Sequence, residues 1–334
     1  MTEAYRAIQL QRFAQSFRAG TEIVTLPLAE PGPGEIRVRN RFCGINGIFD
    51  TQIARNAVDY VTIPLPSFAG VEALGVVEAV GAGVSDFAVG DPVATTRFGR
   101  GYRDVALGAA SDFIAVPAAT AEMLALASTG VSALLALEQI GEVRDGNTVA
   151  ISAAAGGLGH LLVQLALLRG CTVIGVAGGE RKGAFLRGLG VHRVVDYRRE
   201  DLGDVLRAEY PRGLDVAIDS VSGPIFDAFL ANMAPHGRLV VAGAAADLDG
   251  KPEIVTAPRI AHSIYYKGVS VRGFMNGLLT EYWPAARAKL FALHAAGRIA
   301  VTRDDRAFDG LDSIHDAVEW LLSGQSMGKV MVTL

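Results

Sequence analysis

Between residues 147 and 243, β-branched apolar runs alternate with segments of helical periodicity, and this alternation constrains the fold most. Strands are predicted over 147–153, 171–177, 193–197, 214–221 and 238–243. Helices are predicted between them, over 160–169, 181–189, 202–210 and 225–233. Strands joined through helices form a parallel sheet with helices on both faces. The chain is therefore predicted to be an α/β protein with a doubly wound parallel sheet.

The first third of the chain has the short strands and frequent turns of a small barrel or sandwich. Residues 35–41 alternate polar and apolar side chains directly after the turn Pro31-Gly-Pro-Gly34. Strands are also predicted over 70–80 and 113–116. Beyond this region we expect helices over 121–142 and 281–296, and strands over 269–274 and 329–334.

The composition bounds the class of protein. The 334 residues correspond to about two domains. The 35 acidic and 31 basic residues leave a net charge of −4, which argues against a general nucleic-acid binder. Cys43 and Cys171 are too few for a disulfide framework or a four-cysteine zinc site, and they fit a reducing cytoplasm. No uninterrupted apolar run approaches the ~18 residues of a membrane span, so no membrane association is expected.

A glycine-rich turn, Ala153-Ala-Ala-Gly-Gly-Leu-Gly159, lies between the first predicted strand of the sheet and its helix. Glycines in such a turn let the backbone approach a pyrophosphate, which the N-terminus of the next helix attracts. A turn with only a packing role is the alternative. Because the turn lies within a strand–turn–helix unit, we favour dinucleotide binding. No Gly-Lys-Ser/Thr follows, so a nucleotide-hydrolysing P-loop is excluded.

The residues after the second strand of the sheet indicate which dinucleotide is used. This strand ends in small residues up to Gly179, with no carboxylate at its tip for a ribose hydroxyl. Glu180, Arg181 and Lys182 follow. Cations favour a 2′-phosphate, so NADPH is predicted. Glu180 keeps NADH open, and the two cations could instead only solvate the start of a helix.

Several motifs resemble those of a known family. They are Val38-Arg-Asn-Arg-Phe-Cys-Gly-Ile-Asn46, the glycine-rich turn, Asp219-Ser-Val-Ser-Gly223, Lys267-Gly-Val-Ser-Val-Arg-Gly-Phe274 and Gly328-Lys-Val-Met-Val332. Together they resemble the medium-chain dehydrogenase/reductase superfamily, in its zinc-independent quinone oxidoreductase branch and nearest its prostaglandin reductase or alkenal/enone reductase type. The resemblance implies a GroES-like catalytic domain over 1–120, a Rossmann dinucleotide-binding domain over 121–274 and a return to the catalytic domain over 275–334.

The resemblance also implies site residues. Asn46 matches an asparagine near the nicotinamide ribose and the reacting carbonyl; a plain turn residue is the alternative. Tyr197 and Lys182 match the pair that holds the 2′-phosphate, and a core aromatic is the alternative for Tyr197. The residues implied to bind the cofactor are Ala155, Gly156, Gly157, Leu158, Gly178, Lys182, Tyr197, Ser220, Ala242, Gly243, Phe274, Met275, Asn276 and Ser326.

No zinc site is expected. Zinc-dependent members carry a cysteine where Asn46 stands and a histidine where Val71 stands. Cys43 with Glu72 does not supply the three protein ligands that zinc needs. The chain also departs from the branch pattern at Asp50, which lies one residue late, and at Leu134 and Ser326.

The expected reaction is hydride transfer from NADPH to an enone or alkenal double bond, with a quinone as the alternative acceptor. Asn46 is the candidate for orienting the ribose or the carbonyl, whose oxygen gains negative charge. Possible proton donors are Tyr60, Tyr102, Tyr265 and Tyr266, which are also ordinary packing residues.

Three arginines, Arg97, Arg100 and Arg103, could bind an anionic substrate, although a solvated loop is favoured. A structural or RNA-binding protein that only holds the cofactor is the non-enzymatic alternative. A homodimer is implied by the resemblance alone.

Overall fold

The computed structural model describes residues 3–58, 61–247 and 253–334. The chain divides into two compact units. Unit 1 comprises Met1–Ser128 and Arg303–Leu334, and unit 2 comprises Thr129–Thr302. The domain boundaries that the resemblance implies, after residues 120 and 274, are not tested by this division into units and stay a prediction.

Unit 1 is built from short antiparallel strands. The larger sheet has the order β15-β3-β5-β6-β8, and β7 also pairs with β3. The smaller sheet has the order β2-β1-β4. The bounds are β1 Ala4–Leu10, β2 Thr21–Pro27, β3 Glu35–Gly44, β4 Ser67–Phe68, β5 Glu72–Val80, β6 Pro92–Thr95, β7 Val105–Ala109, β8 Phe113–Ala115 and β15 Met331–Thr333. The closing strand β15 therefore joins the chain's end to β3, opposite Cys43.

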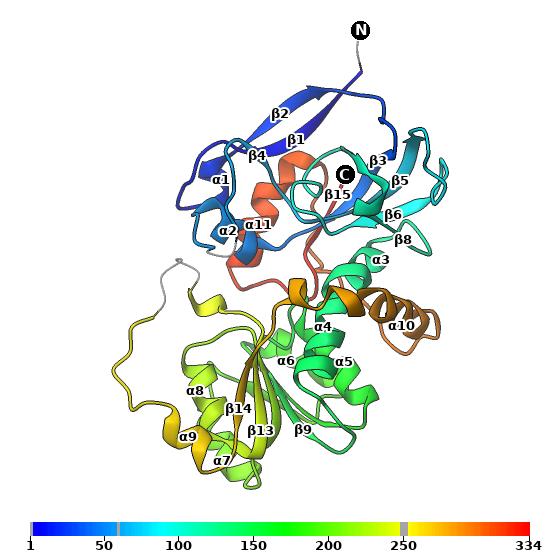
Figure 1. Ribbon diagram of the computed structural model, residues 1–334. Coiled ribbons are helices and arrows are strands. Elements are labelled where there is room, and N and C mark those ends of the chain that lie inside the picture. Colours follow the sequence, from blue (N-terminus) through cyan, green and yellow to red (C-terminus); the bar gives the residue numbers. More distant parts are fainter. Residues whose placement is uncertain (1–2, 59–60, 248–252) are drawn as a thin grey trace. The chain divides into compact units, whose positions relative to one another are not determined.

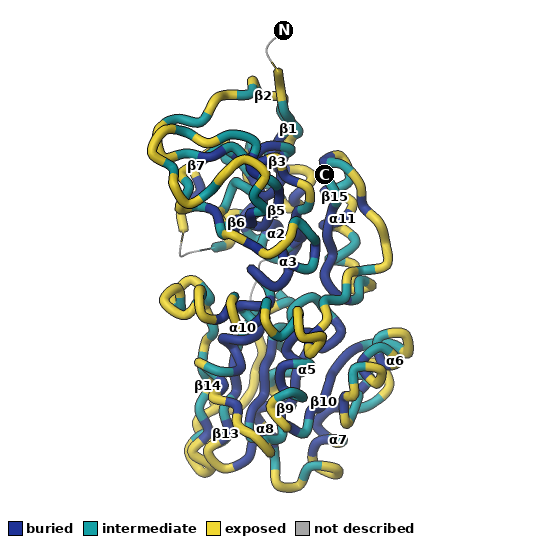
Figure 2. The backbone as a smooth tube through the Cα atoms, turned by 90° about the vertical axis from the view of Figure 1, so that its right-hand side faces the viewer, coloured by how far each residue is buried: buried dark blue, intermediate teal, exposed yellow. Residues whose placement is uncertain are grey.

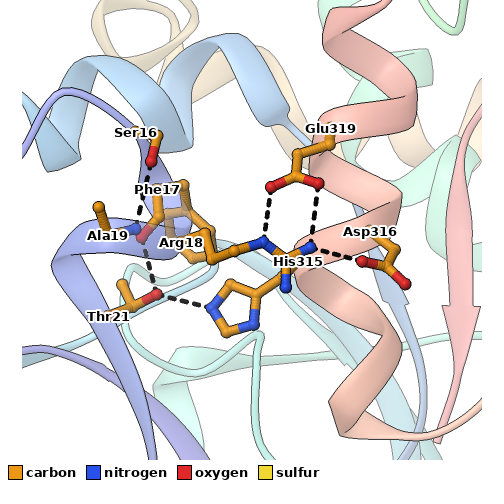
Figure 3. A network of polar contacts seen from close by, with 8 residues as sticks. All are labelled: Ser16, Phe17, Arg18, Ala19, Thr21, His315, Asp316 and Glu319. Atoms are coloured by element: carbon orange, nitrogen blue, oxygen red, sulfur yellow. Dashed lines mark hydrogen bonds and ion pairs between the residues drawn. The ribbon is translucent and has the colours of Figure 1, made fainter.

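In the described part of unit 1, the α-helices beside these strands are α1 Phe17–Gly20, α2 Gly47–Ala54, α3 Ala121–Ala125 and α11 Ile314–Leu322. Charged contacts tie α11 to α1 (Figure 3). The Arg18 guanidinium donates to both Glu319 oxygens, at 2.6 and 3.0 Å, and to Asp316 at 2.5 Å. His315 Nε2 lies 2.8 Å from Thr21 Oγ1, which donates to the Phe17 carbonyl. The ion pairs and the histidine bond thus attach the C-terminal segment to the N-terminal one.

Unit 2 contains the predicted doubly wound sheet. Its six strands are all parallel and have the order β11-β10-β9-β12-β13-β14. Their bounds are β9 Thr148–Ile151, β10 Thr172–Ala177, β11 Arg193–Asp196, β12 Leu214–Asp219, β13 Met233–Val241 and β14 Ser270–Gly273. The central strands β9, β10 and β12 are mostly buried, whereas many of the turns between the strands are exposed (Figure 2).

Helices cover both faces of this sheet (Figure 1). The α-helices described in unit 2 are α4 Val131–Leu135, α5 Gly159–Leu168, α6 Glu180–Gly188, α7 Leu202–Glu209, α8 Pro224–Ala231, α9 Ala261–Tyr265 and α10 Trp283–Ala295. Helix α5 packs on β9 and β10, whereas α8 packs on β12 and β13 and contacts α7. The predicted fold class is confirmed.

One predicted boundary is wrong by five residues. Strand β13 begins at Met233, not at 238, because Met233 pairs with Leu214 before a register shift. His236 occupies the left-handed region at φ 60° within that shift. The apolar helix predicted over 121–142 is confirmed as the continuous helical stretch Ala121–Ile140, which is long enough to cross a membrane by length and composition. Since 72% of its most apolar window is buried inside the protein, a core helix accounts for it.

Candidate active site

Most of the predicted cofactor residues of unit 2 meet at one edge of its sheet. The carboxyl ends of parallel strands share an edge, and in such sheets ligands bind there. The predicted residues follow the ends of five strands: Ala155–Leu158 after β9, Gly178 and Lys182 after β10, Tyr197 after β11, Ser220 after β12, and Ala242 and Gly243 after β13. Phe274, Met275 and Asn276 follow β14 in the same way. The structure thus brings them together, and their roles stay predictions.

The glycine-rich turn packs closely against the start of α5. A Cβ on Gly159 would lie 2.3 Å from the Ala153 carbonyl oxygen, so only glycine lets α5 start against this turn. A Cβ on Gly156 would meet nothing closer than that oxygen, at 3.2 Å. His160 Nδ1 lies 3.0 Å from the Gly156 carbonyl, and its Nε2 accepts from the Thr302 N–H at 3.1 Å. The buried imidazole is therefore neutral, and it holds the turn in place.

The end of β10 is lined by cationic and aromatic side chains. A Cβ on Gly178 would lie 2.7 Å from Arg198 Nε and 3.0 Å from the Tyr197 ring. Asp196 accepts from the N–H groups of Gly179 and Arg198, at 3.0 and 3.1 Å. The Gly179 bond in particular lowers the pKa of Asp196. Sequence reasoning missed Arg198 and Asp196, although both directly flank Tyr197.

A buried pair sets the loop after β12. The Ser152 hydroxyl donates to Asp219 at 2.7 Å and accepts from the Ser220 N–H at 2.9 Å. Asp219 also accepts from the N–H groups of Val221 and Ser222. Asp219 is fully buried, and these three bonds give both of its carboxylate oxygens a partner. The pair links the ends of β9 and β12, and neither residue was predicted as a site residue.

The remaining predicted cofactor residues differ in their surroundings. The Phe274 N–H donates to the Val241 carbonyl at 2.8 Å, which extends β14 beyond its last residue. Asn276 Oδ1 accepts from Trp283 Nε1 at 2.9 Å. Ser326 belongs to unit 1, in the segment after α11. Its neighbour Met327 is held there by an N–H bond to Asp304 at 2.7 Å.

Unit 1 contains a buried polar cluster around Lys329. The Lys329 ammonium lies 3.1 Å from Asn46 Oδ1, 3.1 Å from Glu72 Oε2 and 3.2 Å from the Ile45 carbonyl oxygen. Ser128 Oγ donates to the other Glu72 oxygen at 2.7 Å. Lys329 and Glu72 are each 4% exposed, whereas Asn46 is half-buried. The terminal Gly-Lys motif therefore lies beside the predicted catalytic asparagine.

A second buried pair lies close by in sequence. The Tyr102 hydroxyl donates to Asp50 Oδ2 at 2.5 Å, and both side chains are buried. Burial raises the pKa of Asp50 to about 7 and raises that of Tyr102 well above its usual value. Tyr102 is 0% exposed and committed to Asp50, which argues against it as a proton donor to a substrate. Tyr265 and Tyr266 are exposed at the end of α9, and Tyr60 lies outside the described residues.

Asp50→Asn is expected to change how stability depends on pH. The pKa of Asp50 rises from 3.8 to about 7 on folding, so the folded chain binds more protons between these values. The stability that the protonated group contributes is full below pH 3.8 and is lost as the pH rises to about 7. An asparagine stays neutral and still accepts from Tyr102. The free energy of unfolding of D50N, relative to that of the wild type, should therefore increase by about 4 kcal/mol as the pH rises from 3.8 to about 7.

Urea unfolding of both proteins at several pH values would measure this difference. Asp312→Asn is a suitable control, because an ion pair with Arg6 lowers the pKa of that exposed carboxyl. Its effect on the free energy of unfolding should therefore depend on pH with the opposite sign. A stability difference between D50N and wild type that stays constant with pH would contradict the prediction.

Arg97, Arg100 and Arg103 all contact other side chains of the protein. Arg97 and Arg100 both pair with Asp112, at 2.9 and 3.1 Å. Arg103 is buried, and its guanidinium lies 4.1 Å from the centre of the Phe68 ring. Burial lowers the pKa of Arg103 to about 10. These contacts favour a structural loop over an anion-binding one.

The residues around Cys43 do not suit a metal ion. Among the described residues, no group of three or more His, Cys, Asp or Glu side chains is arranged to hold one. Cys43 is fully buried, and burial raises the pKa of its thiol well above the usual range, away from the thiolate form that zinc binds. The Lys329 ammonium already lies between Asn46 and Glu72. A divalent cation at that point would be repelled by a fixed positive charge.

Comparison with known proteins agrees with this architecture. Residues 32–128 match the alcohol dehydrogenase GroES-like domain, and residues 157–292 match the model described as zinc-binding dehydrogenase. The chain is 35% identical to prostaglandin reductase-3 of Mus musculus, over 94% of this chain and 86% of the relative. It is 31% identical to a probable quinone oxidoreductase of Leishmania amazonensis, over 99% of this chain and 98% of the relative.

A solved structure extends the likeness to three dimensions. Quinone oxidoreductase of Escherichia coli, complexed with NADPH, superposes with a TM-score of 0.84 at 27% identity. The match covers 98% of this chain and 100% of that one. The predicted resemblance is thereby confirmed, and the chain belongs to the medium-chain dehydrogenase/reductase family.

Proposed function

We propose that this protein is an NADPH-dependent reductase that transfers hydride to the double bond of an α,β-unsaturated carbonyl compound without zinc. The observation that carries the proposal is the shared strand-end edge of unit 2, with its glycine-rich turn and the cations after β10 and β11. The names of its relatives, a prostaglandin reductase and quinone oxidoreductases, support the same class of reaction.

The residues of unit 2 fit NADPH. The glycine-rich turn and the start of α5 would hold the pyrophosphate, because the N–H groups of a helix N-terminus favour an anion. Lys182, Tyr197 and Arg198 would hold the 2′-phosphate, beside the small Gly178. Ser220, Ala242 and Phe274 would line the path toward the nicotinamide. When bound, NADPH supplies the hydride.

Unit 1 supplies the polar group for the substrate. Negative charge grows on the carbonyl oxygen during the reduction, and a fixed hydrogen-bond donor stabilises it. Asn46 is half-buried and carries two amide N–H groups that suit this task. The arrangement of Lys329 beside Asn46 supports chemistry without zinc, because the electropositive group is already part of the chain.

An enone and a quinone are the two candidate acceptors, and one experiment separates them. NADPH consumption is measured with a simple alkenal, an enone and a benzoquinone, with NADH as the alternative donor. We expect turnover of the alkenal or enone with NADPH. Quinone turnover alone would favour the quinone oxidoreductase reading, and no turnover of any acceptor would contradict the proposed function. In that case RNA binding that NADPH abolishes would support the non-enzymatic alternative.

We also propose a cytoplasmic homodimer. Among the described residues β14 is the last strand of the sheet, and Val271 on it is exposed; an edge strand of this kind can pair with a second chain, which supports self-association. Light scattering during size-exclusion chromatography would give the mass in solution. A mass of one chain at assay concentrations would contradict the dimer.

A further inference from the structure

The side chain of Asn46 has an unusual partner for its position. Asn46 is the residue directly before α2, where an asparagine ordinarily caps the helix by accepting a backbone N–H bond. Here it makes no such cap bond. Its Oδ1 instead accepts from the Lys329 ammonium, 283 residues away, at 3.1 Å. The Asn46 side chain thus bonds to a residue distant in sequence and not to the backbone of α2.

The chemistry of the two groups determines which way the amide faces. An ammonium group has three N–H donors and no acceptor, so the Asn46 atom that faces it is the oxygen. The Nδ2 group then faces away from Lys329. Among the residues that the structure describes, no acceptor is found for Nδ2. Its two N–H groups therefore stay available for a ligand.

Lys329 itself is too constrained to act on a substrate. Its ammonium has three partners, the Ile45 carbonyl, Asn46 and Glu72, which match its three donors. The space around it is closed, since a Cβ on Gly44 would lie 2.0 Å from Glu72 Oε2 and 3.1 Å from Lys329 Cε. The side chain is only 4% exposed. Lys329 can thus act only through its neighbours.

We infer that Lys329 is a positioning residue that fixes the Asn46 amide so that Nδ2 donates to the carbonyl oxygen of the substrate. The inference rests on the proposed function. The positively charged Lys329 ammonium, bonded to the amide oxygen of Asn46, draws electron density away from the amide N–H groups. This makes the N–H groups stronger hydrogen-bond donors. Glu72, which accepts a hydrogen bond from Ser128, keeps the ammonium in place and balances its charge. The ammonium and the amide together would stabilise the negative charge that develops on the carbonyl oxygen of the substrate.

A double-mutant cycle tests this inference. Lys329→Met alone leaves Glu72 buried without a cation, which is strongly destabilising. The paired change K329M/E72Q is therefore made, because glutamine still accepts from Ser128. N46A is expected to lower kcat about 100-fold, as loss of one oxyanion donor does. K329M/E72Q is expected to lower it about 10- to 100-fold, and the triple variant should fall little below N46A.

Two further variants separate positioning from simple stability. N46D retains an acceptor for Lys329 but has no N–H groups, so it should stay folded and lose kcat as N46A does. K289M removes a half-exposed lysine paired with Glu138 in unit 2, and it should leave kcat unchanged. The NADPH dissociation constant, followed by cofactor fluorescence, should be unaltered in every variant, and circular dichroism would verify folding.

The outcomes are distinct. If the wild type binds NADPH in the titration but reduces no acceptor, the proposed function fails, and the inference that rests on it is overturned with it. If the wild type is active, full kcat in N46D or in K329M/E72Q would overturn the inference. Losses that multiply in the triple variant would overturn it as well, because they would show that Lys329 acts independently of Asn46.

Discussion

Lys182→Glu is expected to raise the dissociation constant of NADPH about 100-fold or more while leaving that of NADH little changed. Lys182 lies in the first turn of α6, which begins after Gly178 and Gly179, the two residues that follow β10. Losing a bond between a cation and a phosphate costs about 1.5–3 kcal/mol, and each 1.4 kcal/mol is tenfold in affinity. A carboxylate in its place adds repulsion of the 2′-phosphate. NADH lacks that phosphate, so it meets neither effect.

Fluorescence titration with both dinucleotides measures the affinity for NADPH divided by the affinity for NADH. This ratio tests the prediction. Arg207→Glu on α7 makes the same change of charge at an exposed site paired with Asp204, and it should leave the ratio intact. Arg198→Gln should lower the ratio in the same direction as Lys182→Glu. Equal weakening of NADPH and NADH by Lys182→Glu would contradict the assignment of the 2′-phosphate site to this strand end.

Gly159→Ala is expected to destabilise unit 2 by more than about 3 kcal/mol, because overpacking against rigid groups is costly. The added Cβ would lie 2.3 Å from the Ala153 carbonyl oxygen and 2.6 Å from Ala154 Cα. Both atoms belong to the backbone of the glycine-rich turn, so no side chain can rotate away. The turn and the start of α5 would have to separate, and NADPH affinity should be lost with them.

Chemical denaturation and cofactor titration of the purified variant would check this expectation. Gly188→Ala in α6 is the matched control, because a Cβ there would meet nothing within 4 Å. Alanine is the better helix former, so this control should be more stable by roughly 0.5–1 kcal/mol. Wild-type stability and affinity in Gly159→Ala would show that the turn adapts and that its glycine is not required.

The fold of unit 2, and the sheet edge at which the predicted cofactor residues meet, could be predicted from sequence because both depend on local patterns. Alternating strand and helix periods require a parallel sheet, and the carboxyl ends of parallel strands must then share one edge. Residues that directly follow these strands, such as Gly178, Ser220 and Phe274, are therefore placed together by chain order alone. Even here the start of β13 was wrong, since the bulge at His236 depends on pairing with β12.

The polar clusters of unit 1 were decided by the tertiary structure. Lys329 meets Asn46 across 283 residues, and Tyr102 meets Asp50 across 52. No periodicity connects such positions, because the contacts arise only when strands from distant parts of the chain pair and close a core. Burial then changes the chemistry of the same residue types, as the pKa of Asp50 shows. Sequence determined the types of residue and the local chain path, and packing decided which of them became partners.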